Sequence, residues 1–84
     1  MKNEQVINNM TDAEIEKEWD KGNDSGSGEA IGYKFETPAE ALKRDGYSVI
    51  REFTSHAGLT GYVGIRDGIT VAVLDDNGPW GVRI

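Results

Sequence analysis

His56 is the only histidine of this 84-residue chain, and histidine is the side chain best suited to proton transfer near neutral pH. General acid or base catalysis would require a carboxylate or a hydroxyl group placed against the imidazole ring. Ser55 precedes His56, but neighbouring side chains on an extended segment point in opposite directions. We therefore interpret His56 as an exposed turn residue. A small hydrolase or nucleotide-binding enzyme stays open as a further hypothesis, which requires a pocket that holds His56 together with an acid.

Two further patterns resemble ligand sites without completing them. Asp75-Asp76-Asn77-Gly78 gathers oxygen ligands before a glycine, yet it lacks the alternating ligand positions and the closing glutamate of a calcium loop. We interpret it as a tight turn, for which Asp, Asn and Gly are the ordinary residues. Gly26-Ser27-Gly28 lacks the later glycine, lysine and hydroxyl residue of a phosphate-binding loop. The sequence thus predicts no catalytic residue, no cofactor and no bound metal.

The negative charge of the chain is concentrated in its first forty residues. Residues 1–40 contain ten carboxylates and four lysines and so carry the whole net charge of −6, whereas residues 41–84 contain five acids and five bases. Acids that steer the approach and a large aromatic residue that anchors the contact are typical of a surface that binds a basic protein. The candidate partner-binding residues are Asp12, Glu14, Glu16, Glu18, Trp19, Asp20, Asp75 and Asp76.

A second interpretation of the acidic segment is purely structural. In it, Ile15 and Trp19 close over the protein's own sheet, and the surrounding carboxylates are only a solvated face. The two interpretations are compatible, because a helix that is docked through Trp19 still displays its acids outward.

The charge also argues against two classes of partner. Binding to DNA phosphates or to anionic lipid needs clustered lysines and arginines, and the few basic residues here are scattered. We expect no direct binding to nucleic acid. We expect none to a membrane either, since no apolar stretch approaches the roughly 18 residues of a membrane span. The sequence contains no cysteine, which suits a reducing compartment, and we expect a full-length cytoplasmic protein.

The acidic residues fall on a predicted N-terminal helix. Thr11 and Glu14 have the spacing of a capping box, so we predict a helix over residues 12–21 that stops at Gly22. The polar residues 1–10 are predicted to fray. A helix this short must dock on another element to be stable.

A linker and a compact unit follow this helix. Residues 22–28 are rich in glycine and serine and predict a flexible linker. The chain is therefore predicted to consist of an acidic helix with its linker, residues 1–28, and a compact α+β domain, residues 29–84.

The compact domain is predicted to be mainly β-structure. Alternation of apolar and polar residues predicts a strand over 30–36, and a second capping box, at Thr37 and Glu40, predicts a helix over 38–45. Four strands in a meander follow, at 47–54, 59–65, 69–74 and 80–84. The predicted fold class is α+β: a small single domain with an antiparallel sheet of four to five strands in the order β-α-β-β-β-β, with helices on one face, preceded by the linker-tethered acidic helix.

The connection around Asp67-Gly68 decides the register of two of these strands. If Asp67-Gly68 were a two-residue turn, Arg66 would face Ile69, and polar and apolar residues would mix on both faces of the sheet. A three-residue loop instead places Ile65 opposite Ile69 and gives one continuous apolar face. We predict the three-residue loop.

In size, acidity, lack of cysteine and α+β character, the chain is similar to small phage-encoded or mobile-element proteins that inhibit host defence, such as anti-CRISPR proteins and other mimics of DNA charge. The resemblance implies a non-enzymatic inhibitor that binds a basic surface on a nucleic-acid-handling protein, with carboxylates in place of phosphates. The alternative is a regulatory or structural subunit, of the antitoxin or immunity type or a homodimer. It would pair through an edge strand or the N-terminal helix, with contacts from Tyr33, Phe35, Trp80 and Ile84.

Overall fold

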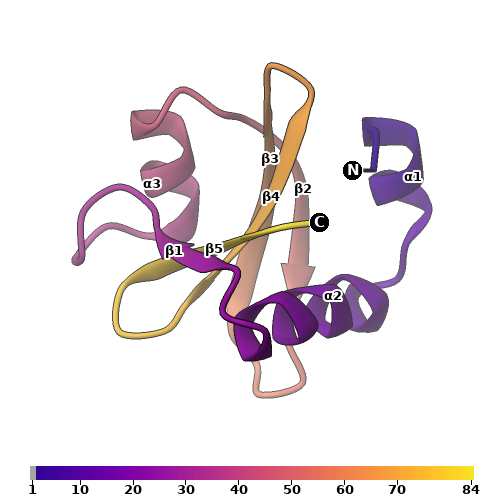
Figure 1. Cartoon of the computed structure of the whole chain (residues 1–84), viewed down its shortest axis with the longest axis horizontal. Helices are drawn as coiled ribbons and strands as arrows, with labels where there is room; N and C mark the ends of the chain where they lie inside the picture. The colour runs from indigo at the N-terminus through magenta and orange to yellow at the C-terminus, as the bar shows by residue number, and fades with distance from the viewer. Residues whose placement is uncertain (1) are drawn as a thin grey trace.

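The computed structural model describes residues 2–84 (Figure 1). Its elements are helices α1 Glu4–Asn9, α2 Asp12–Asp24 and α3 Pro38–Arg44, and strands β1 Gly28–Ala30, β2 Ser48–Thr54, β3 Thr60–Arg66, β4 Ile69–Asp75 and β5 Pro79–Arg83. The strands form one antiparallel sheet in the order β1-β5-β4-β3-β2. The predicted α+β class and the meander of the last four strands are confirmed. None of the helices in residues 2–84 combines the length and the apolar character that a membrane crossing requires.

The sheet lies between two layers of helix, with α1 and α2 on one face and α3 on the other (Figure 1). The core under α1 and α2 contains Ile7, Ile15, Trp19, Phe53, Val63, Ala72, Leu74, Val82 and Ile84. The core under α3 contains Ile31, Ala41, Leu42, Tyr47, Val71 and Val73. The prediction that the helices share one face is wrong. Successive residues of the central strand β4 point to opposite faces and both sets are buried, so each face needs its own cover.

The connection between β3 and β4 is a two-residue turn, and the predicted three-residue loop is wrong. Arg66 pairs with Ile69, and Ile65 pairs with Thr70. Asp67 and Gly68 have positive φ values of 51° and 77°, as both central residues of a type I′ hairpin turn require. The prediction assumed that only one face of the sheet is apolar, and that assumption fails for a sheet covered on both faces.

The N-terminal segment contains a helix where fraying was predicted, although Met1 lies outside the described residues. Asn3 caps α1, because its side-chain oxygen accepts a hydrogen bond from the Val6 N–H at 2.9 Å. Ile7 is completely buried in the core that α1 and α2 share with the sheet. The fraying prediction is wrong because Ile7 is buried, Met10 packs against the same core, and the Arg51 side chain donates to the Ile7 carbonyl.

Helix α2 continues past the predicted stop at Gly22 and ends at Asp24. Gly22 allows α2 to pack closely on β5, because a Cβ atom at this position would overlap the Val82 side chain. The prediction of a flexible linker over residues 22–28 is also wrong. Gly28 already belongs to β1, which pairs with β5 at the edge of the sheet.

The predicted strand over residues 30–36 is wrong beyond its first residue. β1 ends at Ala30, and Gly32 has a positive φ of 63°, which turns the chain out of the sheet. Ile31 is buried, whereas Tyr33 and Phe35 are exposed. The alternating pattern therefore falls on a loop that leads into α3.

Both predicted capping boxes are confirmed. The Thr11 hydroxyl accepts a hydrogen bond from the Glu14 N–H, and the Glu14 carboxylate accepts one from the Thr11 N–H at 2.8 Å. Thr37 and Glu40 repeat the arrangement at the start of α3. The backbone N–H group of the capping threonine is the main cause that lowers the pKa of Glu14 and of Glu40 below its usual value.

The two ends of the described chain meet on the central strand of the sheet, as the N and C marks in Figure 1 show. The buried Thr70 hydroxyl lies 3.1 Å from the carbonyl oxygen of Lys2 and 2.7 Å from that of Ile84. The Ile84 N–H donates to the Thr70 carbonyl at 3.0 Å, and the Lys2 N–H donates to the Ile84 carbonyl at 3.3 Å. The first and last described residues are therefore held side by side.

Candidate partner-binding site

A groove at one end of the sheet brings together five of the eight predicted partner-binding residues. Successive turns of a meander alternate between the two ends of a sheet, so the β2–β3 turn and the β4–β5 turn come to the same end (Figure 1). The second half of α2 lies beside them and completes a groove of about 320 Å³. We call it the acidic groove, and the predicted residues that line it are Glu16, Trp19, Asp20, Asp75 and Asp76.

Apart from His56, the ionisable side chains that line the acidic groove are all carboxylates. Among the described residues, no lysine or arginine lines it. Asp20, Asp75 and Asp76 are exposed, and none of them forms an ion pair within residues 2–84. Leu59 and Trp19 contribute apolar surface between these acids. Unpaired carboxylates on two walls of a groove attract a cation placed between them.

The β4–β5 turn fixes the second acidic wall. The Asp75 carboxylate accepts a hydrogen bond from the Gly78 N–H at 3.0 Å, which is the chemistry of the predicted tight turn. The Asp76 N–H in turn donates to the Gly78 carbonyl at 2.8 Å. Throughout residues 2–84, no group of three or more His, Cys, Asp or Glu side chains could hold a metal ion.

The remaining three residues of the predicted set lie outside the acidic groove. Glu14 and Glu18 lie on the side of α2 that also carries Lys17 and Lys21, and Glu18 pairs with Lys2 at 3.5 Å. Asp12 is bound to two groups of β2, described below. The helix therefore has one side on which lysines balance the acids and another, toward the groove, on which no lysine or arginine does so.

Trp19 lies mainly in the protein's own core. Its side chain is 7% exposed, and its Nε1–H donates to the Trp80 carbonyl oxygen on β5 at 2.9 Å. This is the position that the structural interpretation of the acidic helix predicts. A role for Trp19 against a partner stays a prediction, and it involves only the edge of the ring that lines the groove.

Glu16 and His56 form a pair that the sequence did not reveal. Glu16 is 9% exposed, and its two carboxylate oxygens accept from the His56 backbone N–H at 2.9 Å and lie 2.6 Å from His56 Nδ1. The contact fastens the β2–β3 turn to α2. The His56 side chain itself is 84% exposed. Ser55, its neighbour, is engaged elsewhere, because its hydroxyl accepts from the Leu59 N–H.

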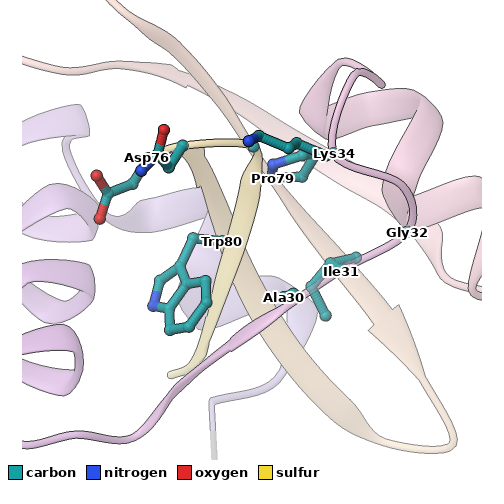
Figure 2. A pocket seen from close by; sticks show the side chains of 9 residues that line it. Ala30, Ile31, Gly32, Lys34, Asp76, Pro79 and Trp80 are labelled. Atoms are coloured by element: carbon teal, nitrogen blue, oxygen red, sulfur yellow. The ribbon is translucent and has the colours of Figure 1, made fainter.

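A second pocket lies on the other side of Asp76, between the start of β5 and the loop after β1. We call it the Trp80 pocket; it has a volume of about 280 Å³. Figure 2 shows Trp80 on one side, Ala30 and Ile31 on the other, and Lys34, Pro79 and Asp76 at the top of the view. Its wall is mostly apolar, and its charged side chains belong to Lys34 and Asp76.

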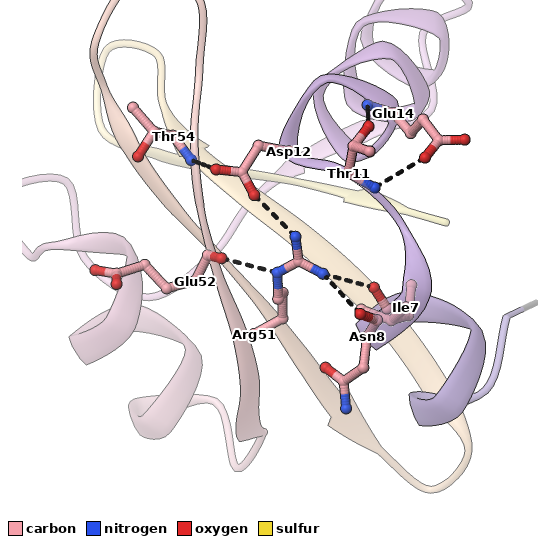
Figure 3. A network of polar contacts seen from close by, with 8 residues as sticks. All are labelled: Ile7, Asn8, Thr11, Asp12, Glu14, Arg51, Glu52 and Thr54. Atoms are coloured by element: carbon pink, nitrogen blue, oxygen red, sulfur yellow. Dashed lines mark hydrogen bonds and ion pairs between the residues drawn. The ribbon is translucent and has the colours of Figure 1, made fainter.

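Arg51 is the centre of a polar network that sequence reasoning did not single out (Figure 3). A bulge between Val49 and Arg51 interrupts the pairing of β2 with β3, and the Arg51 side chain reaches the N-terminal helices. Its guanidinium donates to the Ile7 carbonyl at 2.9 Å and to the Asp12 carboxylate at 2.8 Å. The second oxygen of Asp12 accepts from the Thr54 N–H at 3.0 Å. Arg51 thus joins α1, α2 and β2.

Asp12 makes the stability of the protein depend on pH in the acidic range. The Thr54 N–H, and next the Arg51 guanidinium, lower the pKa of Asp12 below its usual value. The pKa of Asp12 is therefore lower in the folded protein than in the unfolded chain, where it is near 4. The ionised carboxylate stabilises the fold above that unfolded value, and this contribution is lost as the pH falls through the folded pKa.

We expect Asp12→Asn to be less stable than the wild type at neutral pH and to approach it in stability as the pH falls below about 4. Urea denaturation followed by circular dichroism across this range measures the difference in the free energy of unfolding. A difference that stays constant from neutral to acidic pH would contradict the assignment.

The alternative function, a regulatory or structural subunit that pairs with another chain, named four contact residues, and the structure divides them between the core and the surface. Ile84 is 7% exposed and Trp80 is half-buried, whereas Tyr33 is 65% and Phe35 is 94% exposed. On the outer strand β2, the Thr54 N–H and the Glu52 carbonyl are already occupied by the Asp12 and Arg51 side chains. Pairing of another strand along this part of β2 would have to displace them.

Comparison of the chain with protein-family models, with curated proteins and with solved structures finds no match.

Proposed function

We propose that the chain is a non-enzymatic protein-binding module that occupies a basic surface on a nucleic-acid-handling partner, with the carboxylates of the acidic groove in place of phosphates. The observation that carries the proposal is the placement of Asp20, Asp75 and Asp76, exposed and unpaired within residues 2–84, on two walls of one groove. An inhibitor of phage or mobile-element origin, of the anti-CRISPR type, acting in the cytoplasm, is part of the same proposal.

Charge and shape support different steps of this binding. The net charge of −6 draws a basic surface toward the chain from a distance. In contact, a lysine or arginine side chain lays its aliphatic stem on Leu59 and on the edge of Trp19, while its charged end meets the carboxylates. Because the walls are held by the Gly78 turn contact and by the Glu16–His56 pair, little ordering is required when the partner binds.

The test compares two variants of equal net charge. The groove variant carries Asp20→Asn, Asp75→Asn and Asp76→Asn, and asparagine retains the oxygen that Asp75 offers to the Gly78 N–H. The control variant carries Glu4→Gln, Glu29→Gln and Asp67→Asn, three exposed acids outside the acidic groove. Each set of three changes takes the net charge from −6 to −3. Any difference between the two variants therefore comes from the position of the charges.

The binding assay uses a panel of CRISPR effector proteins, each loaded with fluorescently labelled DNA, and measures displacement of the DNA by anisotropy. We expect the wild type to displace DNA from a panel member, the groove variant to require at least about tenfold more protein, and the control variant to require less than about threefold more. Added salt should weaken the wild-type affinity. Absence of displacement throughout the panel, or equal losses in the two variants, contradicts the proposal.

The acidic groove also contains the pair that the hydrolase hypothesis requires, His56 with Glu16. In that hypothesis, Glu16 would orient the ring and Nε2 of His56 would accept the proton. None of the described residues places a hydroxyl group or an oxyanion donor at Nε2, and the ring lies largely in solvent. Binding is therefore the function that the geometry of the groove supports best.

A further inference from the structure

Phe35 is the most exposed large apolar side chain among the described residues, at 94%. Hydrogen bonds and an ion pair stabilise the loop that carries it. The Glu36 carboxylate accepts from the Tyr33 N–H at 2.6 Å and from Arg44 at 2.6 Å. The Arg44 guanidinium lies 4.2 Å from the centroid of the Tyr33 ring. The backbone on both sides of Phe35 is thus held in place, so little backbone freedom is lost if the ring is buried by another molecule.

The Trp80 pocket lies directly beside this projecting ring. Lys34, the residue before Phe35, lines the pocket, and its backbone packs against Gly78 in the β4–β5 turn (Figure 2). Ala30, Ile31 and Pro79 give the pocket an apolar wall that suits a phenyl ring. A projection and a cavity placed side by side on one surface are the two halves of an isologous contact, in which each copy of a chain offers both.

We propose that the chain forms a twofold homodimer in which Phe35 of each copy enters the Trp80 pocket of the other. Within residues 2–84 of one copy, neither Lys34 nor Asp76 forms an ion pair, although both line the pocket. The reciprocal insertion brings Lys34, next to the entering ring, to Asp76 at the pocket of the other copy. This charge complementarity favours a second copy as the occupant, since the chain itself carries both members of the pair.

The net charge of the chain decides whether added salt strengthens or weakens the proposed dimer. Two chains of charge −6 repel each other, and two exposed ion pairs offset only a small part of that repulsion. Added salt should therefore strengthen the dimer, whereas it should weaken binding to a basic partner. Asp76 lines both the acidic groove and the Trp80 pocket, so one chain cannot use this carboxylate in both contacts at once. The failure of one proposal is still distinguishable from the failure of the other, because the two associations respond to salt in opposite directions.

Sedimentation equilibrium of the whole chain, from micromolar to millimolar concentration and at low and high salt, tests the dimer. We expect a reversible monomer–dimer equilibrium, tighter at high salt, that Phe35→Ser weakens at least about tenfold. Val6→Ser, a change at another exposed apolar side chain, on α1 and outside the Trp80 pocket, is the control and should leave the equilibrium unchanged. Thermal unfolding verifies that Phe35→Ser folds, as expected for a side chain with so little packing.

A charge exchange distinguishes the proposed contact from other apolar association. Lys34→Asp alone and Asp76→Lys alone should each weaken the dimer, because each places like charges opposite each other. The double variant should return the dissociation constant to within about threefold of the wild type. A wild type that stays monomeric throughout, an unchanged dimer in Phe35→Ser, or a double variant that is not rescued would each overturn the proposal.

Discussion

Replacing Trp19 by alanine is expected to lower the free energy of unfolding by about 3–5 kcal/mol, because the ring is buried between α2 and the sheet. A domain of this size has a total stability of roughly 4–13 kcal/mol, so the change removes a large share of it. Urea denaturation followed by far-ultraviolet circular dichroism measures the loss without relying on the fluorescence of the altered tryptophan. The helix α2, which depends on this contact, should become the least protected element in hydrogen exchange.

Trp19→Phe separates the packing of the ring from its hydrogen bond. Phenylalanine keeps an aromatic ring in the core but cannot donate to the Trp80 carbonyl, so the loss should be only about 1–2 kcal/mol. If Trp19 served instead mainly as an anchor for a partner, Trp19→Ala would leave the stability of the isolated chain unchanged and affect only binding. A denaturation midpoint equal to that of the wild type would therefore reject the structural role.

Replacing Arg51 by methionine should lower the free energy of unfolding by about 2–4 kcal/mol. The long apolar side chain retains much of the packing, but the carbonyl groups of Ile7 and Asn8 and the Asp12 carboxylate lose a charged donor. The Arg51 side chain is 19% exposed, so water replaces only part of these contacts. Arg51 holds α1 against β2. In Arg51→Met, the amide hydrogens of the N-terminal residues should therefore exchange faster than those of the sheet.

Arg44→Met is the matched control for Arg51→Met. Arg44 also pairs with a carboxylate, that of Glu36, but its side chain is 48% exposed. Its loss should therefore destabilise the protein much less than the loss of Arg51 does. Combining Arg51→Met with Asp12→Asn then isolates the coupling between the two partners, and strictly additive effects would show that the ion pair contributes little.

The sequence predicted features that depend on a few neighbouring residues. The capping boxes at Thr11 and Thr37 need only a glutamate three residues later. Gly46, the glycine that follows the predicted helix over 38–45, has a φ of 85°, the left-handed conformation in which glycine commonly ends a helix. The four strands of the meander were located by alternation and by their turn residues. These signals act locally, and distant packing did not override them at these positions, whereas the alternation over residues 30–36 falls on a loop.

Features that depend on distant residues could not be predicted in the same way. The β3–β4 register follows from the presence of α3 on the second face of the sheet, and α2 passes through Gly22 because Val82 lies against it. In the candidate site, the negative charge and the pair Asp75 and Asp76 were visible in the sequence. The packing of Ile15 and Trp19 decides which acids of α2 face the groove. The contact between Glu16 and His56 joins residues forty positions apart, and no local pattern indicates it.

The meeting of Lys2 and Ile84 at Thr70 makes this fold suited to a closed covalent ring. A short peptide could join Lys2 and Ile84 without crossing the sheet, because their backbone atoms are already within hydrogen-bond distance. Closure would reduce the entropy of the unfolded chain while changing little in the native contacts. The same proximity allows new ends to be opened at the exposed Asp67-Gly68 hairpin, which lies at the end of the sheet away from the acidic groove. A permuted or cyclic form would thus keep the acidic groove intact.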